Sequence, residues 1–170
     1  MLKIIDGGVC AAKGFTANGI HCGIRKNKEK RDLSLIFSEK KATAATVYTT
    51  NLVKGAPLIV TKAHIADGTA QAIIWNSGNA NTCNANGIEI AEQMSDLLAA
   101  QMNIASDDVV VASTGVIGQP LDIAPIKAGI PLLVSGLAAD GSLNAAEGIM
   151  TTDTRVKEIA VSFTVGGTEC

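Results

Sequence analysis

A serine, a threonine and a glycine follow directly on a β-branched apolar run, and residues of these types in this order can act on a negative charge. Val109 to Val111 is typical of a buried strand, and Ser113, Thr114 and Gly115 come where it ends. Such a turn presents backbone N–H groups and two hydroxyls, which can bind an anion or stabilise the oxyanion of an acyl transfer. An ordinary tight turn has the same pattern, so this segment alone leaves both interpretations open.

A second polar segment, Asn76 to Asn81, contains three asparagines, a serine and a glycine in six residues. It follows a predicted strand that starts at Ala70 and precedes a strongly predicted helix. Loops in this position lie at the carboxyl edge of a sheet, where α/β proteins usually bind ligands. Asparagine side chains also bond to their own backbone, so a purely structural loop is an equal alternative.

The segment Met150 to Thr154 places three threonines and an aspartate directly after a predicted helix. One interpretation is a turn closed by aspartate and hydroxyl hydrogen bonds. The other is a hydroxyl-lined pocket for a polar small molecule such as an amino acid, in which Asp153 braces the hydroxyls or pairs with an amine.

Other candidate residues give weaker signals. Lys13 beside Gly14 suggests an anion contact but lacks the frame of a phosphate-binding loop. His21 has no evident serine or aspartate partner, which favours a structural role. The basic run 25–31 is diluted by Glu29 and has no interleaved aromatic residue, which favours a solvated loop. No complete catalytic set is recognisable, so we expect the nucleophile to lie outside this sequence.

Composition limits the possible classes of protein. The 170 residues are 47% apolar and only 18% charged, which predicts one domain with a large buried fraction. A net charge of −2 gives no basic surface for nucleic acid or anionic lipid. Four cysteines without C-x-x-C spacing and two histidines argue against a structural zinc. We expect a cytoplasmic protein with no bound cofactor or metal and no nucleic-acid or membrane partner.

These segments must be positioned by a mixed set of elements, and the pattern predicts an α/β (α+β) fold. The predicted strands are Leu33–Ser38, Ala45–Thr49, Leu58–Thr61, Ala70–Asn76, Val109–Ala112 and Ile159–Val165. The predicted helices are Gly87–Met102 with Asn86 as cap and Glu89 in a capping box, Ser142–Met150 with Ser142 as cap, and Asp122–Gly129 with Pro125 in its first turn. Gly166 and Gly167 suggest a turn into a further segment.

Six segments in a fixed order resemble the ornithine acetyltransferase family, also called glutamate N-acetyltransferases. They are Lys13–Phe15, Asp32–Ile36, Thr49–Lys54, Asn76–Asn81, Ala112–Gly118 and Ile149–Thr154. Each segment is weak alone, but the ordered set covers nearly the whole chain and is specific. The resemblance implies mixed sheets layered with helices, in the self-processing αββα architecture of that family.

The resemblance also implies a mechanism and a set of residues. The family precursor cleaves itself before a threonine, which becomes the N-terminal nucleophile of a β chain and uses its own α-amine as base. By resemblance, Thr114 and Gly115 form the oxyanion hole, Thr151 contacts the amino-acid substrate and Thr152 is the weaker alternative. The implied reaction is ping-pong transfer of acetyl from N2-acetylornithine to glutamate in arginine biosynthesis, with acetyl-CoA as a possible further substrate. The implied assembly is an α2β2 heterotetramer with the β chain.

Some features depart from the family pattern. The glycine-rich cleavage segment, which carries a substrate-binding lysine and ends in Ala-Thr, would follow Cys170. We therefore expect residues 1–170 to be the α-chain part of a longer precursor, without its cleavage segment and inactive alone. Trp75 replaces a small aliphatic residue, and 84–86 also differ. The competing hypotheses are a non-catalytic truncated fragment and a related self-processing aminopeptidase.

Overall fold

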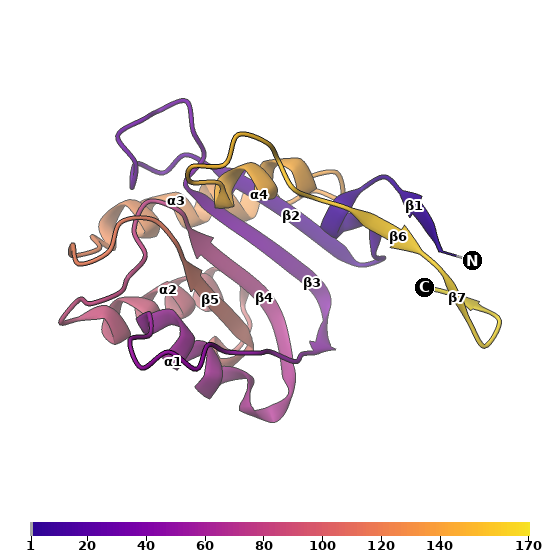
Figure 1. The fold of residues 1–170 in the computed structure, drawn as a ribbon, viewed down its shortest axis with the longest axis horizontal. Helices are drawn as coiled ribbons and strands as arrows, with labels where there is room; N and C mark the ends of the chain where they lie inside the picture. The colour runs from indigo at the N-terminus through magenta and orange to yellow at the C-terminus, as the bar shows by residue number, and fades with distance from the viewer. Residues whose placement is uncertain (1) are drawn as a thin grey trace.

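The computed structural model, described here for residues 2–170, is built around a four-stranded sheet with strand order β2-β3-β4-β5 (Figure 1). The strands are β2 (Phe15–Ile20), β3 (Leu33–Thr43), β4 (Thr69–Asn76) and β5 (Val109–Ser113). Neighbours are antiparallel except β4 and β5, which are parallel. The helices are α1 (Ala56–His64), α2 (Gly87–Met102), α3 (Ala124–Ser135) and α4 (Ser142–Ile149). The predicted mixed α/β fold is confirmed.

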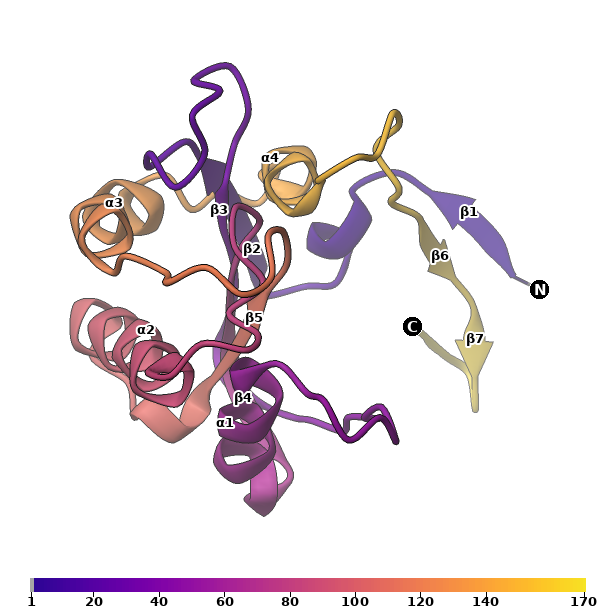
Figure 2. The ribbon, with the colours of Figure 1, turned by 60° about the vertical axis from the view of Figure 1, so that its left-hand side comes forward.

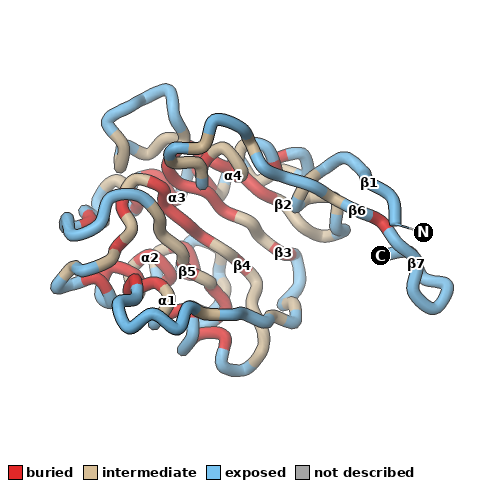
Figure 3. Tube along the Cα trace, in the orientation of Figure 1, coloured by how far each residue is buried: buried red, intermediate tan, exposed pale blue. Residues whose placement is uncertain are grey.

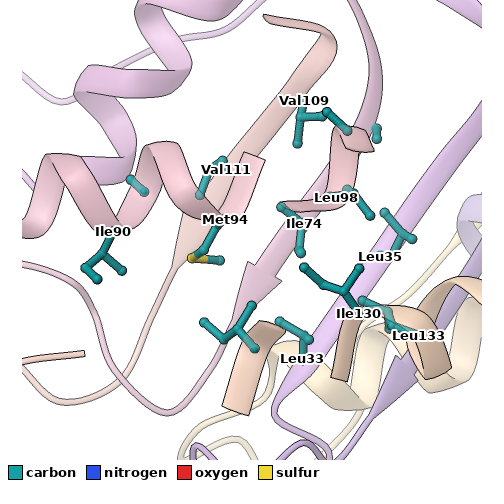
Figure 4. Packing of buried hydrophobic residues seen from close by; sticks show 14 of the residues in the cluster. Leu33, Leu35, Ile74, Ile90, Met94, Leu98, Val109, Val111, Ile130 and Leu133 are labelled. Atoms are coloured by element: carbon teal, nitrogen blue, oxygen red, sulfur yellow. The ribbon is translucent and has the colours of Figure 1, made fainter. Parts of the chain in front are cut away.

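The main core lies between one face of this sheet and the helices α2 and α3 (Figure 2). Alternate strand residues point into it, as the two-residue period of a strand requires. Figure 4 shows this packing, formed by Leu33, Leu35, Ile74, Ile90, Met94, Leu98, Val109, Val111, Ile130 and Leu133. Helix α4 covers part of the opposite face, where Ala17, Trp75 and Ala145 form a smaller cluster. The helices thus hold the sheet from both sides and α1 runs along its β5 edge.

A thin ribbon projects from this body and carries both ends of the described chain (Figure 1). Strand β1 (Lys3–Ile5) pairs with β6 (Ala160–Ser162), and β7 (Thr164–Val165) pairs with β8 (Thr168–Glu169). The ribbon is mostly exposed, as Figure 3 shows. Three single-turn helices, η1 (Gly8–Ala11), η2 (Ile65–Asp67) and η3 (Ser106–Asp108), complete the secondary structure.

Several predicted elements are confirmed. Helix α2 has the predicted bounds, and β3, β4 and β5 contain the predicted strands. Helix α3 has Pro125 in its first turn, as expected, but it begins two residues later than predicted and continues to Ser135, six residues beyond the predicted end at Gly129. The capping predictions are wrong in detail. Asn86 precedes α2 but makes no side-chain cap, and Gly141 rather than Ser142 precedes α4.

Other expected strands are absent from the structure. Residues 45–49 form no strand within the described chain, because Val47 is 98% exposed and the segment has no neighbouring strand to pair with. Residues 58–61 lie in α1, where Pro57 in the first turn and packing against β5 overcome the β-branched composition. The expected strand 159–165 is divided into β6 and β7.

Strand β2 was not expected, because Asn18 and Gly19 are poor strand formers. Its place is explained by close contact with α4. An ideal Cβ on Gly19 would lie 2.0 Å from the Asn144 carbonyl oxygen, and one on Gly141 would lie 1.8 Å from the Ala17 carbonyl oxygen. Glycine at both positions lets the backbones of β2 and α4 approach each other.

We predict that Gly19→Ala destabilises the fold more than Gly68→Ala does. A methyl group added at Gly19 would collide with a backbone atom, so the substitution should cost about 2–3 kcal/mol of folding free energy through overpacking. A methyl group added at Gly68 would meet open space, so this substitution should cost only about 1 kcal/mol, from the strain of an alanine at φ +77°. Urea unfolding of the two variants measures the difference. A smaller loss for Gly19→Ala would mean that α4 moves away freely and does not constrain β2.

Candidate functional site

The predicted turn after β5 and the asparagine segment after β4 lie at the same end of the sheet, because these two strands are parallel. Backbone hydrogen bonds join them, among them one from the Thr114 N–H to the Asn76 carbonyl oxygen at 2.9 Å and one from the Ala80 N–H to the Val116 carbonyl oxygen at 2.8 Å. The Thr114 amide is therefore already engaged. By contrast, neither the Thr114 hydroxyl nor the Gly115 N–H has a hydrogen-bond partner anywhere in residues 2–170.

Gly115 adopts a backbone conformation that glycine alone tolerates here. Its φ is +127°, and an ideal Cβ would lie 2.6 Å from the Gly78 carbonyl carbon and 2.8 Å from the Asn79 nitrogen. Both strain and collision would follow from any side chain. The turn is thus set by its contact with the asparagine segment, which fixes the direction of the Gly115 N–H.

The asparagine side chains are nearly all used within the protein. Asn76 donates to the Ser113 hydroxyl at 2.7 Å and accepts from the Gly78 and Asn79 N–H groups. Asn79 donates to the Gln119 carbonyl at 3.0 Å. Further along, Asn81 (φ +47°) donates to the Gly87 carbonyl at 2.8 Å. These bonds favour the structural alternative for this loop, which holds the 114–118 turn in place.

The opposite edge of β5 is held by helix α1. The Thr61 hydroxyl donates to the Val111 carbonyl at 2.8 Å and accepts from the Val111 N–H at 3.0 Å, as a neighbouring strand would. One turn further along α1, His64 Nδ1 contacts the Val109 carbonyl oxygen at 3.0 Å. Strand β5 is therefore bonded on both edges as far as Val111, two residues before its end.

Arg25 connects the asparagine segment to the threonine segment. Its Nε donates to the Ser77 carbonyl at 2.9 Å, and its Nη2 donates to the carbonyls of Ser77 and Met150. The fully buried Asp32 accepts from the Cys22 and Arg25 N–H groups at 2.7 and 2.9 Å. The basic run is therefore not simply a solvated loop, and that expectation is corrected for Arg25.

The structure also tests the interpretations of Arg31 and His21. It corrects the first and supports the second. Arg31 donates to Glu147 at 3.0 Å and to Asn144 at 2.8 Å, so it anchors α4 instead of facing solvent alone. His21 Nδ1 lies 3.1 Å from an oxygen of Asp32, which supports a structural role with a partner that spacing did not reveal. Lys13 is exposed.

The threonine segment forms the predicted turn. Asp153 accepts from the Thr151 N–H at 3.2 Å and pairs with Lys157. The Lys157 ammonium, followed by the Thr151 N–H, lowers the pKa of Asp153 below its usual value. The hydroxyls of half-buried Thr151 and exposed Thr152 have no partner in the described part of the chain. They remain available to a ligand.

Metal or thiol chemistry finds no support in this region. No group of three or more His, Cys, Asp and Glu residues within 2–170 could hold a metal ion. Burial, followed by the Asp32 carboxylate, raises the pKa of the Cys22 thiol to about 12. That thiol stays protonated near neutral pH and is a poor nucleophile. None of the helices in the described residues has the length and apolar character needed to span a membrane.

Sequence reasoning proposed Thr114, Gly115, Thr151 and Thr152 as site residues, and their roles stay predictions, but it missed the side chains that hold these segments in place. Thr61 was assigned to a strand, and Arg25 was assigned to a solvated loop. A sequence shows that a threonine or an arginine can form hydrogen bonds, but it does not show with which groups. Here the partners of Thr61 and Arg25 are 50 or more residues away in the chain.

Comparison with known proteins gives one consistent answer. The ArgJ family matches residues 16–170. The arginine biosynthesis bifunctional protein ArgJ of Caldanaerobacter subterraneus is 44% identical over 167 residues, which are 98% of this chain and 41% of the relative. The glutamate N-acetyltransferase of Methanocaldococcus jannaschii is 46% identical over 169 residues, which are 98% and 40% of the two chains. This chain therefore spans about 40% of the length of these curated relatives.

Two solved structures are similar over nearly the whole chain. The arginine biosynthesis bifunctional protein argJ of Bacillus halodurans has a TM-score of 0.93 and 38% identity, covering 99% of this chain and 89% of that one. The ornithine acetyltransferase of Mycobacterium tuberculosis, complexed with ornithine, has a TM-score of 0.86 and 32% identity, covering 95% and 88%. The fold and the order of its elements are shared with both.

We predict that Arg25→Met loosens the threonine segment. The variant keeps the length of the side chain but leaves the Ser77 and Met150 carbonyls without their donor, at about 1–3 kcal/mol. Hydrogen exchange of the amides in 150–154 should accelerate by about tenfold or more. Lys26→Met, at an exposed position of the same loop, is the matched control and should change nothing. Equal exchange in the two variants would show that Arg25 does not hold the segment.

We also predict selective alkylation of the cysteines at pH 8. Cys83 and Cys170 are exposed, whereas the raised pKa of Cys22 leaves very little thiolate. A pKa of about 12 leaves Cys22 with about a thousandth of the thiolate that a free cysteine has at this pH, so iodoacetamide should modify the exposed pair about a thousandfold faster than Cys22. Mass spectrometry of timed samples measures the rates, and unfolding in urea should remove the difference. Comparable rates in the folded protein would contradict the burial of this thiol.

Proposed function

The chain belongs to the ArgJ family, and on that premise we propose that it is the α-chain part of an enzyme that transfers acetyl from N2-acetylornithine to glutamate. The observation that carries the proposal is the turn after β5. It holds two hydrogen-bond donors without partners, on a backbone fixed by β4 on one side and α1 on the other. Preorganised donors of this kind stabilise the oxyanion of an acyl transfer.

The proposed donors are the Thr114 hydroxyl and the Gly115 N–H. The Thr114 backbone amide takes no part, because it is bonded to Asn76. Glycine is required at 115 because of its φ of +127° and because a Cβ there would collide with the Gly78 backbone. Two unpartnered donors on adjacent residues are the kind of groups that stabilise a tetrahedral oxyanion.

The proposed reaction has two halves with the same chemistry. A threonine hydroxyl, on the β chain formed when the precursor cleaves itself, attacks the acetyl carbonyl carbon. The C–N bond breaks, the hydroxyl proton passes through the threonine α-amine to the departing ornithine amine, and an acetyl ester remains. The glutamate amine then attacks that ester, the C–O bond breaks, and a proton returns to the threonine oxygen. The products are ornithine and N-acetylglutamate.

The amino-acid part of the substrate is assigned to the threonine segment. Thr151 is the proposed contact and Thr152 the weaker alternative, since both hydroxyls lack a protein partner. Arg25 would set the distance between this segment and the oxyanion turn through its bonds to Ser77 and Met150. The complex of the Mycobacterium tuberculosis relative with ornithine supports an amino-acid ligand of this class.

Further parts of the proposal concern the rest of the protein. The relatives are about two and a half times as long as this chain, which supports the presence of further protein in the complete enzyme. We propose that this further protein is the β chain and that the assembly is α2β2. We place the enzyme in the cytoplasm, with no bound cofactor and with acetyl-CoA as a possible second acetyl donor. The nucleophile is not within residues 2–170 in this proposal, so the chain alone is inactive.

The test is acetyl transfer by the protein expressed from its complete gene. We expect N-acetylglutamate to form from N2-acetylornithine and glutamate, and Thr114→Val to lower kcat by about 10²–10³, because one oxyanion donor is lost. Thr114→Ser keeps the hydroxyl and should retain most of kcat. Chromatography of the products measures both. Peptide cleavage without acetyl transfer would favour the aminopeptidase hypothesis, and unchanged kinetics of Thr114→Val would remove this residue from the oxyanion site.

A further inference from the structure

A cleft of about 240 Å³ lies beside β5, between that strand, helix α1 and the extended segment that precedes α1. One wall is formed by Val110 to Ser113, which lead directly into the oxyanion turn. Leu58 comes from α1, Tyr48 from the preceding segment, and Ala80 from the asparagine loop. The cleft is thus lined both by the asparagine loop, which holds the turn in place, and by the end of β5, which leads into the proposed catalytic turn.

The cleft is tied to the oxyanion turn at more than one point. The Ala80 N–H donates to the Val116 carbonyl at 2.8 Å, and the Gly118 N–H donates to the Thr82 carbonyl at 2.9 Å. Ala80 and Thr82 both line the cleft. The oxyanion turn is therefore bonded directly to the wall of the cleft, and Ser113 of that wall immediately precedes Thr114.

The lining tells which chemical group would fit. Apolar side chains and neutral hydroxyls line the cleft, and no charged side chain does. A charged amino-acid end would lose its hydration there without a partner, whereas an alkyl chain would gain by leaving water. The volume exceeds that of a methyl group several times over, since one water occupies about 30 Å³ in the liquid.

We propose that this cleft receives the acyl chain of the substrate and that the enzyme transfers acyl groups longer than acetyl. The inference rests on the proposed function, since it assigns a place to the acyl part of the same reaction. Leu58 is then a residue that determines acyl specificity. Its side chain lines the cleft from α1, at a position that takes no part in the oxyanion contacts.

The experiment compares N2-acetyl-, N2-propionyl- and N2-butyrylornithine as donors to glutamate, with the protein expressed from its complete gene. The unmodified enzyme should use the butyryl donor with a kcat/KM within about tenfold of the acetyl donor. Leu58→Trp fills the cleft and should lower kcat/KM for the butyryl donor by about tenfold or more, with a much smaller effect on acetyl. Leu58→Ala enlarges the cleft and should shift the preference toward the longer donors.

Ile59→Trp is the matched control, because Ile59 is the next residue of α1, is 49% exposed and does not line this cleft. It should leave the ratio of butyryl to acetyl transfer unchanged. Acetyl transfer with no use of longer donors, or with a ratio that neither Leu58 variant alters, would overturn the inference and leave the proposed function standing. Absence of transfer from every donor would overturn both.

Discussion

The parallel pairing of β4 with β5 is the constraint on which the site depends. Parallel strands end at the same edge of a sheet, so the two loops that follow them must meet. The Thr114 N–H extends the ladder by one bond to Asn76, and beyond Gly115 the two loops pair again, since the Val116 carbonyl accepts from the Ala80 N–H. Gly115, with φ +127°, interrupts this pairing, and its N–H has no partner in the described residues. The interruption of the ladder at Gly115 thus leaves a donor that chemistry can use.

Most polar side chains around this point fall into two sets, and the buried Ser77 hydroxyl, which has no partner in the described residues, belongs to neither. Asn76, Asn81 and Asp32 are fully buried, and their side chains bond to nearby backbone groups, which holds loops without regular structure in one conformation. The Thr114 and Thr151 hydroxyls are only partly buried and have no partner in the described residues. This difference separates residues that hold the site in place from residues that can contact a ligand. Residue type alone does not reveal to which set a residue belongs.

The sequence predicted the parts of the fold that depend on local signals. The period of apolar residues gave α2 its bounds, and the β-branched runs located β4 and β5. The misses arise from distant contacts. Gly19 lies in a strand because α4 approaches it, and Thr61 lies in a helix although its neighbours are β-branched. The candidate residues were found through ordered motifs, but the bonds of Arg25 that connect them span 52 and 125 residues.

The exposure of the turn bears on how it could act. Gly115 is exposed, and the apolar side chains next to it, Val116 and Ile117, are 48% and 62% exposed. Donors facing water stabilise an oxyanion weakly, because water competes for them and screens their field, whereas the same donors in a dry site act much more strongly. Val116 and Ile117 offer an apolar surface that a covering segment could bury together with the donors. In the proposed function, acyl transfer at this turn would therefore need a covering segment that excludes water as well as a segment that supplies the nucleophile, and a single β chain seated over residues 114–117 would meet both needs.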